Sequence, residues 1–305
     1  MNHDLIVIGA GPAGLSAGIY GARAGLRTLI LEMSMPGGHV ATTHYIENYP
    51  GFPDGISGFD LAEKMKQQAT RFGVQVIGTQ ARAVEKRDRS FAVVTDSGEF
   101  ESSALIVATG TRWKKLNVPG EDALRGRGVS YCATCDGPLF KGREVAVVGC
   151  GNSGVQEGSF LLEFVTRIIF VEFLPEVTAD KILYDRIKGD KRVEFLLNHE
   201  LRSINGTQRV ESITVQDRRT HAEKVLPVAG VFVYIGLDPD TGFLKDILLD
   251  EKGFIKVDEH MQTSQPGIFA AGDICSKEIR QVVTACAEGA TAAINAYNYL
   301  RSLGR

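Results

Sequence analysis

Two cysteines separated by two residues have the clearest capacity for chemistry in this sequence. Cys132 and Cys135 form a Cys-Ala-Thr-Cys segment, which Asp136 follows directly. A pair at this spacing acts as a redox disulfide or as half of a zinc site, or it has no joint function. Zinc usually needs a second such pair, whereas the other three cysteines are scattered singly, so we predict a redox dithiol and no metal site. Asp136 exchanges a proton with a thiol or caps a helix, and both roles stay open.

Two segments repeat the same order of features and could hold electron carriers for this dithiol. Residues 5–32 and 145–172 each contain an apolar run, a Gly-x-Gly-x-x-Gly turn, a helix of small residues, a second apolar run and a final glutamate. This order is typical of a βαβ unit that binds a dinucleotide. One such turn alone is weak evidence, but two in the full context predict two dinucleotide sites. A flavin at one site and a nicotinamide at the other would pass two electrons to the dithiol.

Each residue of the repeated motif has a physical task. The first glycine permits a tight turn, the second lets a pyrophosphate approach the backbone, and the third lets the helix lie close to its strand. The phosphates would bind free N–H groups at the start of the helix, and the glutamate would accept hydrogen bonds from ribose hydroxyls. These residues are Gly9, Gly11, Gly14 and Glu32 in the first segment and Gly149, Gly151, Gly154 and Glu172 in the second.

Composition limits the class of protein. With 305 residues, 44% of them hydrophobic, the chain is long enough for two domains with cores of their own. A net charge of −3 disfavours a nucleic-acid partner. No apolar run approaches the roughly 18 residues of a membrane span, and the N-terminal segment does not resemble a signal peptide. Five cysteines without an export signal indicate a cytoplasmic protein rather than a disulfide scaffold.

Periodicity predicts the elements around the two units. Residues 74–107 and 193–236 alternate in a strand-like manner and predict hairpins, with a turn at Asn205-Gly206 in the second stretch. An alanine-rich helix is predicted from Gln281 to Leu303. The apolar residues that fall together on one face of this helix are Val282, Val283, Cys286, Ala290, Ile294 and Tyr297.

Short motifs distributed over the whole chain form a specific combination. They are GAGPAG (9–14), GGH (37–39) with a Thr pair (42–43), ENYPGF (47–52), ATG (108–110), CATCDGPLF (132–140), GCGNSG (149–154), AAGD (270–273) and RQVVTACAEG (280–289). This combination resembles the low-molecular-weight thioredoxin reductases and the related flavoprotein of the alkyl hydroperoxide reductase system. The resemblance implies an α/β protein with two Rossmann-like dinucleotide-binding domains of three-layer ββα/βαβ architecture, the second inserted in the first. It places FAD in a discontinuous domain, 1–113 and 245–305, and NAD(P)H in 114–244, which carries the CxxC pair.

The resemblance also assigns residues to FAD. Glu32 would bind the ribose, Asp273 would contact the ribityl–phosphate region, and Gln281 with Val282 would face the flavin at the start of the last helix. His39 stands where the family commonly has glutamine. The full set expected at FAD is Gly9, Gly11, Pro12, Ala13, Gly14, Glu32, Gly38, His39, Asn48, Thr109, Gly110, Gly272, Asp273, Arg280, Gln281 and Val282.

The second nucleotide is expected to be NADH rather than NADPH. Family members that use NADPH carry a His-Arg-Arg segment after the last strand of this unit, whereas residues 171–177 (VEFLPEV) contain no positive charge. This segment resembles the hydroperoxide reductase flavoproteins, which use NADH. A 2′-phosphate beside Glu172 would also place like charges together. The full set expected here is Gly149, Gly151, Asn152, Ser153, Gly154, Glu172 and Phe173.

The implied activity is that of a thioredoxin-disulfide reductase. Hydride would pass from NADH to FAD, then to the Cys132–Cys135 disulfide, then to thioredoxin or a thioredoxin-fold protein. By the resemblance, Cys135 would pair with the flavin, Cys132 would attack the protein substrate, and the enzyme would be a homodimer. One alternative is a flavin NADH oxidase or ferredoxin-linked flavoprotein reductase with an auxiliary dithiol, which would stay fully active after Cys132→Ser. Another is a non-enzymatic FAD-binding or redox-sensing module, whose flavin NADH would not bleach.

Overall fold

Contacts divide the chain into two compact units, one of which is inserted in the other. The structure is a computed structural model that describes residues 3–304. Unit 1 contains the residues up to Arg112 and those from Asp238 onward, and unit 2 runs from Trp113 to Leu237. Within the described range, no helix is both long enough and apolar enough to cross a membrane.

Two short strands form the connections between the units. Strand β7 (Thr111–Trp113) leads into unit 2, β16 (Leu237–Pro239) leads out, and the two strands pair with each other. The sequence places residues 238–244 in the inserted domain, but in the structure they pack with unit 1. Phe243 joins a buried cluster of that unit, and Asp240 pairs with Arg112 at 2.6 Å.

Unit 1 contains a parallel sheet in the order β3-β2-β1-β6-β17. Strand β6 is long and serves two layers. Its C-terminal part pairs in parallel with β1 and β17, whereas its N-terminal part pairs antiparallel with β5, which in turn pairs with β4. The strands are β1 (His3–Ile8), β2 (Thr28–Glu32), β3 (Gln75–Gly78), β4 (Ala81–Lys86), β5 (Phe91–Thr95), β6 (Gly98–Val107) and β17 (Ile268–Ala270).

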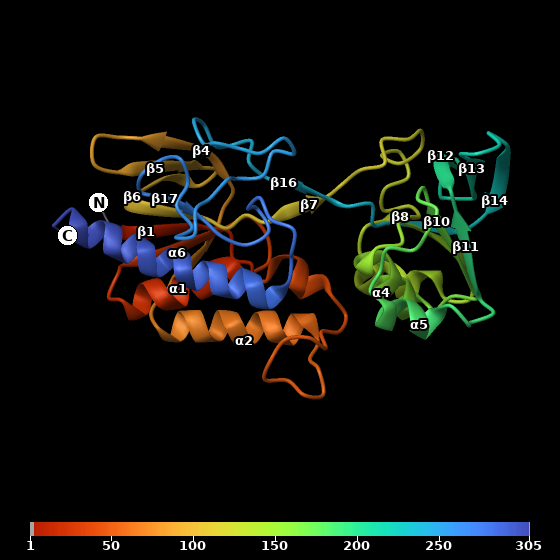
Figure 1. Cartoon of the computed structure of the whole chain (residues 1–305), viewed down its shortest axis with the longest axis horizontal. Coiled ribbons are helices and arrows are strands. Elements are labelled where there is room, and N and C mark those ends of the chain that lie inside the picture. Colours follow the sequence, from red (N-terminus) through yellow and green to blue (C-terminus); the bar gives the residue numbers. More distant parts are fainter. Residues whose placement is uncertain (1–2, 305) are drawn as a thin grey trace. The chain divides into compact units, whose positions relative to one another are not determined.

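Alternate residues of the parallel strands enter two different cores. On β1, Leu5 and Val7 join the cluster formed with the helices, while Ile6 and Ile8 join the cluster formed with β5. Helices therefore cover one face of the sheet and antiparallel strands the other (Figure 1). The helices of unit 1 are α1 (Pro12–Arg23), α2 (Gly58–Arg71) and α6 (Val282–Ser302), with a short 3₁₀ helix η1 (Gly38–Thr42).

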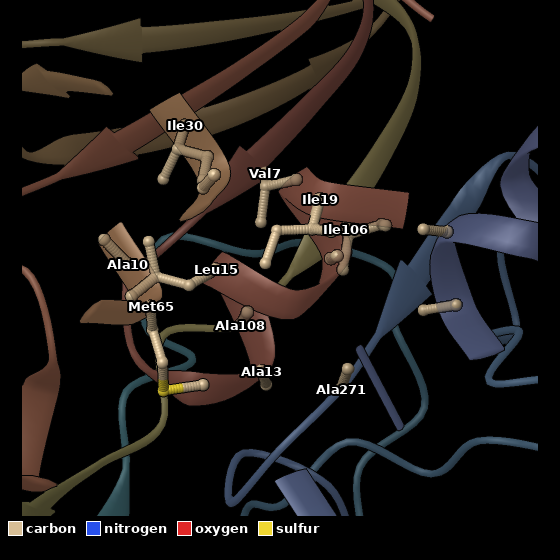
Figure 2. Packing of buried hydrophobic residues seen from close by; sticks show 14 of the residues in the cluster. Val7, Ala10, Ala13, Leu15, Ile19, Ile30, Met65, Ile106, Ala108 and Ala271 are labelled. Carbon is tan, nitrogen blue, oxygen red and sulfur yellow. The ribbon is translucent and has the colours of Figure 1, made fainter. Parts of the chain in front are cut away.

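The final helix, α6, has the predicted extent but buries a face other than its bulky one. Val283 and Ile294 remain 42% and 47% exposed, respectively. The buried face is made of small residues, because α6 lies very close to α1: a Cβ on Gly289 would lie 2.0 Å from the Ala13 carbonyl oxygen. Figure 2 shows part of the core on this side of the sheet, including Ala13, Leu15 and Ile19 of α1. The buried residues of α6 are Ala285, Gly289, Ala292, Ala293, Ala296 and Leu300.

Unit 2 repeats the same three layers. Its parallel sheet has the order β11-β10-β9-β15-β8, and a separate antiparallel sheet has the order β12-β13-β14. The strands are β8 (Val129–Ser130), β9 (Glu144–Val148), β10 (Arg167–Glu172), β11 (Val193–Leu197), β12 (His199–Asn205), β13 (Ser212–Asp217), β14 (Glu223–Pro227) and β15 (Gly230–Val233). The helices are α3 (Ala133–Asp136), the 3₁₀ helix η2 (Gly137–Phe140), α4 (Asn152–Leu161) and α5 (Lys181–Ile187).

The predicted hairpins are present, but the strands that flank them belong to the parallel sheets. The antiparallel pairs β4–β5, β5–β6, β12–β13 and β13–β14 confirm the hairpin prediction for those segments. Strands β3, β11 and β15 instead pair in parallel, with β2, β10 and β9 respectively. The edge strands β3 and β11 are only partly buried, so their side-chain pattern does not differ from that of a hairpin strand.

Candidate redox and nucleotide sites

The glycine turn of unit 1 has the geometry that a phosphate-binding turn requires. Gly9 has a φ of +106°, and a Cβ there would lie 2.4 Å from the carbonyl oxygen of Ala108. A Cβ on Gly14 would lie 1.8 Å from the Gly9 carbonyl oxygen, so helix and strand approach as closely as glycine allows. A Cβ on Gly11 would meet no protein atom within 4 Å. Gly11 caps α1, which begins with Pro12 and then Ala13, and its open side leaves the helix N-terminus accessible to an anion.

Glu32 lies at the edge of a cavity at the carboxyl ends of the parallel strands. Its side chain is only 9% exposed. Oε2 accepts a hydrogen bond from Ala10 N at 2.6 Å, and Oε1 accepts one from Ser34 N at 2.9 Å. In a dinucleotide-binding fold this is the place of the adenosine ribose. Residues that line the cavity include Gly9, Glu32, Met33, Thr79, Gln80 and Thr109.

Unit 2 reproduces this arrangement almost atom for atom. Gly149 has a φ of +102°, and a Cβ on Gly154 would lie 2.0 Å from the Gly149 carbonyl oxygen. Glu172 is 5% exposed, and its Oε2 and Oε1 accept hydrogen bonds from Cys150 N at 2.7 Å and from Leu174 N at 3.0 Å. Both glutamates are therefore held by two backbone N–H groups, which leaves further lone pairs for ribose hydroxyls.

At the start of α4, the two polar side chains that were predicted to bind the nucleotide, Asn152 and Ser153, have different surroundings. Gly151 caps the helix, and the atom nearest to a Cβ there would be the Thr178 hydroxyl oxygen, at 3.7 Å. The Asn152 amide is already paired with Asp180, donating to its carboxylate at 2.9 Å and accepting from its N–H at 2.7 Å. Ser153 is exposed. Of the two side chains expected at this phosphate, Ser153 is thus the one that projects into solvent.

Residues predicted at FAD from two distant segments meet beside the first glycine turn. Gly38 lies next to Gly11, since a Cβ on Gly38 would be 3.5 Å from the Gly11 Cα. His39 Nε2 lies 2.7 Å from the carbonyl oxygen of Thr111. Burial lowers the pKa of this imidazole, although the Thr111 carbonyl opposes the shift. Thr109 Oγ1 donates to the Asp240 carbonyl at 3.2 Å. Gly110, between the end of β6 and the start of β7, has a φ of +64°, which lets the chain turn there.

Two predicted FAD residues carry buried polar atoms that lack hydrogen-bond partners within the described chain. These atoms are Asp273 Oδ1 and Arg280 Nε. The nearest ion-pair partner of Asp273 is Lys277, at 3.6 Å, but the Lys277 ammonium is also bonded to Glu288 at 2.7 and 2.8 Å. Glu288 in addition accepts the N–H of Gly272 at 2.8 Å and so fixes the turn before Asp273. Buried polar groups of this kind are usually satisfied by a ligand or by water.

The remaining residues that were predicted at FAD lie around the start of α6. Gln281 caps the helix, and the Thr284 hydroxyl accepts the Gln281 N–H at 3.3 Å. The Asn48 amide donates to Gln281 Oε1 at 3.0 Å, which joins two segments that lie far apart in the sequence. Val282 packs partly against the core, so its side chain is only partly available to a ligand.

Cys132 and Cys135 form a disulfide in unit 2, with their Cα atoms 5.3 Å apart. Cys132 caps the one-turn helix α3, and its Sγ accepts the Cys135 N–H at 3.1 Å. Cys135 is exposed and Cys132 is partly buried. Asp136 makes no side-chain capping hydrogen bond at the start of η2. The structure therefore shows no capping by the Asp136 side chain, and proton exchange at Asp136 stays a prediction.

A buried carboxyl on α4 was not predicted from the sequence. Burial raises the pKa of Glu157 from its ordinary value of 4.5 to about 7. Its Oε2 has no hydrogen-bond partner among residues 3–304. The neighbouring Tyr234 hydroxyl accepts the N–H of Ala133, the first residue of α3, at 2.9 Å. Glu157 acts electrostatically on Tyr234. A titratable acid therefore lies close to the tyrosine whose hydroxyl is bonded to the first residue of α3. Nothing in its local sequence distinguishes it from a surface glutamate.

Arg218 was also missed, because it comes from a turn distant in the sequence. It follows β13, and its Nη1 donates to the carbonyl oxygen of Phe173 at 2.7 Å. The absence of arginine in 171–177 therefore does not mean that this strand end lacks a nearby cation. Clusters of three or more His, Cys, Asp or Glu side chains suited to a metal ion are not found among the described residues.

Each unit has a glycine turn closed by a buried glutamate, and unit 2 also contains the Cys132–Cys135 disulfide. This combination is typical of the class of two-nucleotide disulfide oxidoreductases. The chain matches the family model of pyridine nucleotide-disulphide oxidoreductases over residues 3–289. It is 43% identical over 303 residues to a thioredoxin reductase of Listeria innocua, covering 99% of this chain and 95% of the relative. A thioredoxin reductase of Treponema pallidum is 40% identical, with 99% and 98% covered.

Solved structures show the same architecture. The thioredoxin reductase of Lactococcus lactis superimposes with a TM-score of 0.96 at 36% identity, covering 98% of this chain and 99% of the other. That of T. acidophilum gives a TM-score of 0.94 at 36% identity, with 99% of each chain covered. The chain belongs to the pyridine nucleotide-disulphide oxidoreductases, within their low-molecular-weight thioredoxin reductase family.

Proposed function

We propose that this protein is an NADH-dependent, FAD-containing thioredoxin reductase. The observation that carries the proposal is the Cys132–Cys135 disulfide on the same unit as a complete second nucleotide turn. Family membership and the similarity to the thioredoxin reductases named above support thioredoxin as the substrate class. FAD would lie in unit 1 and the nicotinamide nucleotide in unit 2.

The residues of unit 1 fit FAD. The open side of Gly11 leaves room for a pyrophosphate, and the Glu32 carboxylate is placed for a ribose. The unpartnered atoms of Asp273 and Arg280 would gain partners from ribityl hydroxyls and phosphate or flavin oxygens. When bound, FAD supplies two-electron transfer between the nicotinamide and the disulfide. The protein orients it and excludes water.

Glu172 supports the choice of NADH. Its carboxylate is held by Cys150 N and Leu174 N, and neither of these two partners is a cation. A ribose 2′-hydroxyl can donate to such a carboxylate, whereas a 2′-phosphate would be repelled. We expect NADH to exceed NADPH by at least roughly tenfold in kcat/KM, which needs only ~1.4 kcal/mol. Glu172→Ala combined with Phe173→Arg should narrow or reverse this preference. Equal efficiency of the two nucleotides with the unmodified enzyme would contradict the assignment.

The hydrogen bond to Cys132 supports different roles for the two cysteines in disulfide exchange. After reduction, the Cys135 N–H that now reaches Cys132 Sγ would stabilise a thiolate at Cys132. A stabilised thiolate is the attacking form in disulfide exchange. Cys132 would therefore attack the disulfide of thioredoxin, while Cys135 resolves the mixed disulfide. Asp136 would hold or release the proton that this exchange requires.

The decisive experiment separates flavin reduction from disulfide exchange. NADH should bleach the flavin absorbance of Cys132→Ser and of Cys135→Ser under anaerobic conditions, because hydride transfer precedes exchange. Neither variant should reduce thioredoxin, and Cys286→Ser serves as the control because Cys286 is a free, partly buried cysteine of α6 that is not among the residues expected at either nucleotide. Thioredoxin turnover by either active-site variant above a few per cent of the unmodified enzyme would overturn the proposal. Full NADH oxidation by Cys132→Ser would indicate a flavin oxidase instead.

A further inference from the structure

An exposed aromatic side chain lies beside the buried glutamate of unit 2. Phe173 directly follows Glu172 at the end of β10, and 53% of its surface is exposed. In unit 1 the same position is Met33, which follows Glu32, is also 53% exposed and lines the cavity at that strand end. Both units thus present a large apolar side chain where the adenosine end of a dinucleotide would lie.

Arg218 holds the Phe173 ring in place from another part of the chain. Its guanidinium carbon lies 5.4 Å from the centre of the ring, and its Nη1 donates to the Phe173 carbonyl oxygen at 2.7 Å. The Arg218 backbone N–H donates to the Asn198 carbonyl at 2.8 Å, and the Asn198 N–H donates to the Leu174 carbonyl at 2.9 Å. These bonds tie together the ends of β10, β11 and β13 around one exposed ring.

A partly exposed ring held by a guanidinium is suited to stacking with a purine. Bases stack on aromatic rings and on guanidinium planes irrespective of which base is present. The Glu172 carboxylate, one residue away, is placed to accept hydrogen bonds from the neighbouring ribose. A single exposed aromatic residue is ordinary on a protein surface, but here it is fixed between a buried acid and a cation.

We propose that Phe173 and Arg218 form a platform on which the adenine of the nicotinamide nucleotide stacks. Phe173 would contact the base, and Arg218 is a positioning residue that acts through the ring. The inference rests on the proposed function, because it assumes that unit 2 binds this nucleotide. Since the guanidinium of Arg218 is engaged by the ring and the carbonyl of Phe173, the platform should strengthen NADH and NADPH binding equally.

Titration of ADP into the oxidised, FAD-loaded protein isolates this half of the nucleotide, and calorimetry measures its affinity. Phe173→Ala should weaken ADP binding about tenfold and Arg218→Ala about threefold, from ordinary stacking and cation–π strengths. Phe173→Tyr keeps the ring and should bind as the unmodified protein does. Because Arg218 acts through the ring, adding Arg218→Ala to Phe173→Ala should cause no further loss. Arg219→Ala is the matched control, since the Arg219 side chain is 70% exposed and pairs with Asp217.

Each outcome decides the inference. Unchanged ADP affinity in Phe173→Ala, or in Arg218→Ala, would overturn the platform, and the proposed function would stand if NADH still bleached the flavin. Selective loss of NADPH binding in Arg218→Ala would make Arg218 a phosphate ligand and would equally overturn it. If the unmodified protein bound neither ADP nor NADH, the platform and the proposed function would fail together.

Discussion

Replacement of Glu157 by glutamine should stabilise unit 2 at pH 8 and change its stability little at pH 5. Oε2 of Glu157 is buried and has no hydrogen-bond partner in the described part of the chain. Burial raises the pKa of this carboxyl from 4.5 to about 7. At a pH between 4.5 and about 7, Glu157 therefore keeps its proton in the folded protein but has released it in the unfolded chain.

The sign and size of the effect follow from this difference in bound protons. Where the folded state binds more protons than the unfolded state, stability falls as pH rises. The contribution of Glu157 is therefore fully present below pH 4.5 and is lost as pH rises through about 7. At about 1.4 kcal/mol per pKa unit, the loss at pH 8 is about 3 kcal/mol, and at pH 5 it is under about 1 kcal/mol. Glutamine has nearly the same shape and does not ionise, so Glu157→Gln removes this loss.

The only tryptophan of the chain gives a local signal for this measurement. Trp113 belongs to unit 2, and its ring lies edge-on to that of Tyr234 at 5.3 Å. Urea unfolding of the FAD-loaded protein, followed by Trp113 fluorescence, should give a larger gain for Glu157→Gln at pH 8 than at pH 5. Glu163→Gln, at an exposed glutamate just beyond α4, should show no such difference. An equal effect of Glu157→Gln at both pH values would refute the reasoning.

Gly11→Ala should leave the fold of unit 1 intact but lower FAD affinity at least about tenfold, because its Cβ would occupy the space left for a pyrophosphate. Equilibrium dialysis measures the FAD affinity, and the melting temperature of the apoprotein measures the stability of the fold. Gly14→Ala should instead lower the melting temperature, because its Cβ would lie 1.8 Å from the Gly9 carbonyl oxygen. Glu121→Gln should destabilise unit 2 by about 1–3 kcal/mol, because the buried carboxylate accepts two backbone N–H groups and the Tyr131 hydroxyl. Urea unfolding measures this loss, and an unchanged midpoint would show that these bonds contribute nothing.

The two glycine-turn units could be predicted because their backbone conformation requires particular residues. A positive φ at Gly9 and a helix in contact with a strand at Gly14 exclude every side chain, so the requirement is visible as spacing in the sequence. The glutamate that closes each unit is equally visible, because its carboxylate accepts one N–H group from the glycine turn and one from the residue two positions further along the chain. The α6 boundaries followed from composition in the same way.

Contacts between distant segments could not be predicted by such local rules. The buried face of α6 is its small-residue face, because α6 lies so close to α1 that larger side chains do not fit between the two helices. Arg218 reaches Phe173 only because β13 ends near β10. Glu157 differs from an ordinary helix glutamate only in its surroundings, which a single sequence does not show.

The pairing of β7 with β16 has a consequence for how unit 2 is carried by unit 1. The chain leaves unit 1 along one strand and returns along the strand beside it, and neighbouring strands lie about 5 Å apart. For the folding of unit 1, residues 113–237 are thus equivalent to a hairpin turn. The folding of unit 2 brings the two ends of the insertion together, so the folding of unit 1 does not bear the entropy cost of closing this long loop. We therefore expect unit 1 to accept inserted domains of other sizes, provided that their ends lie a strand spacing apart.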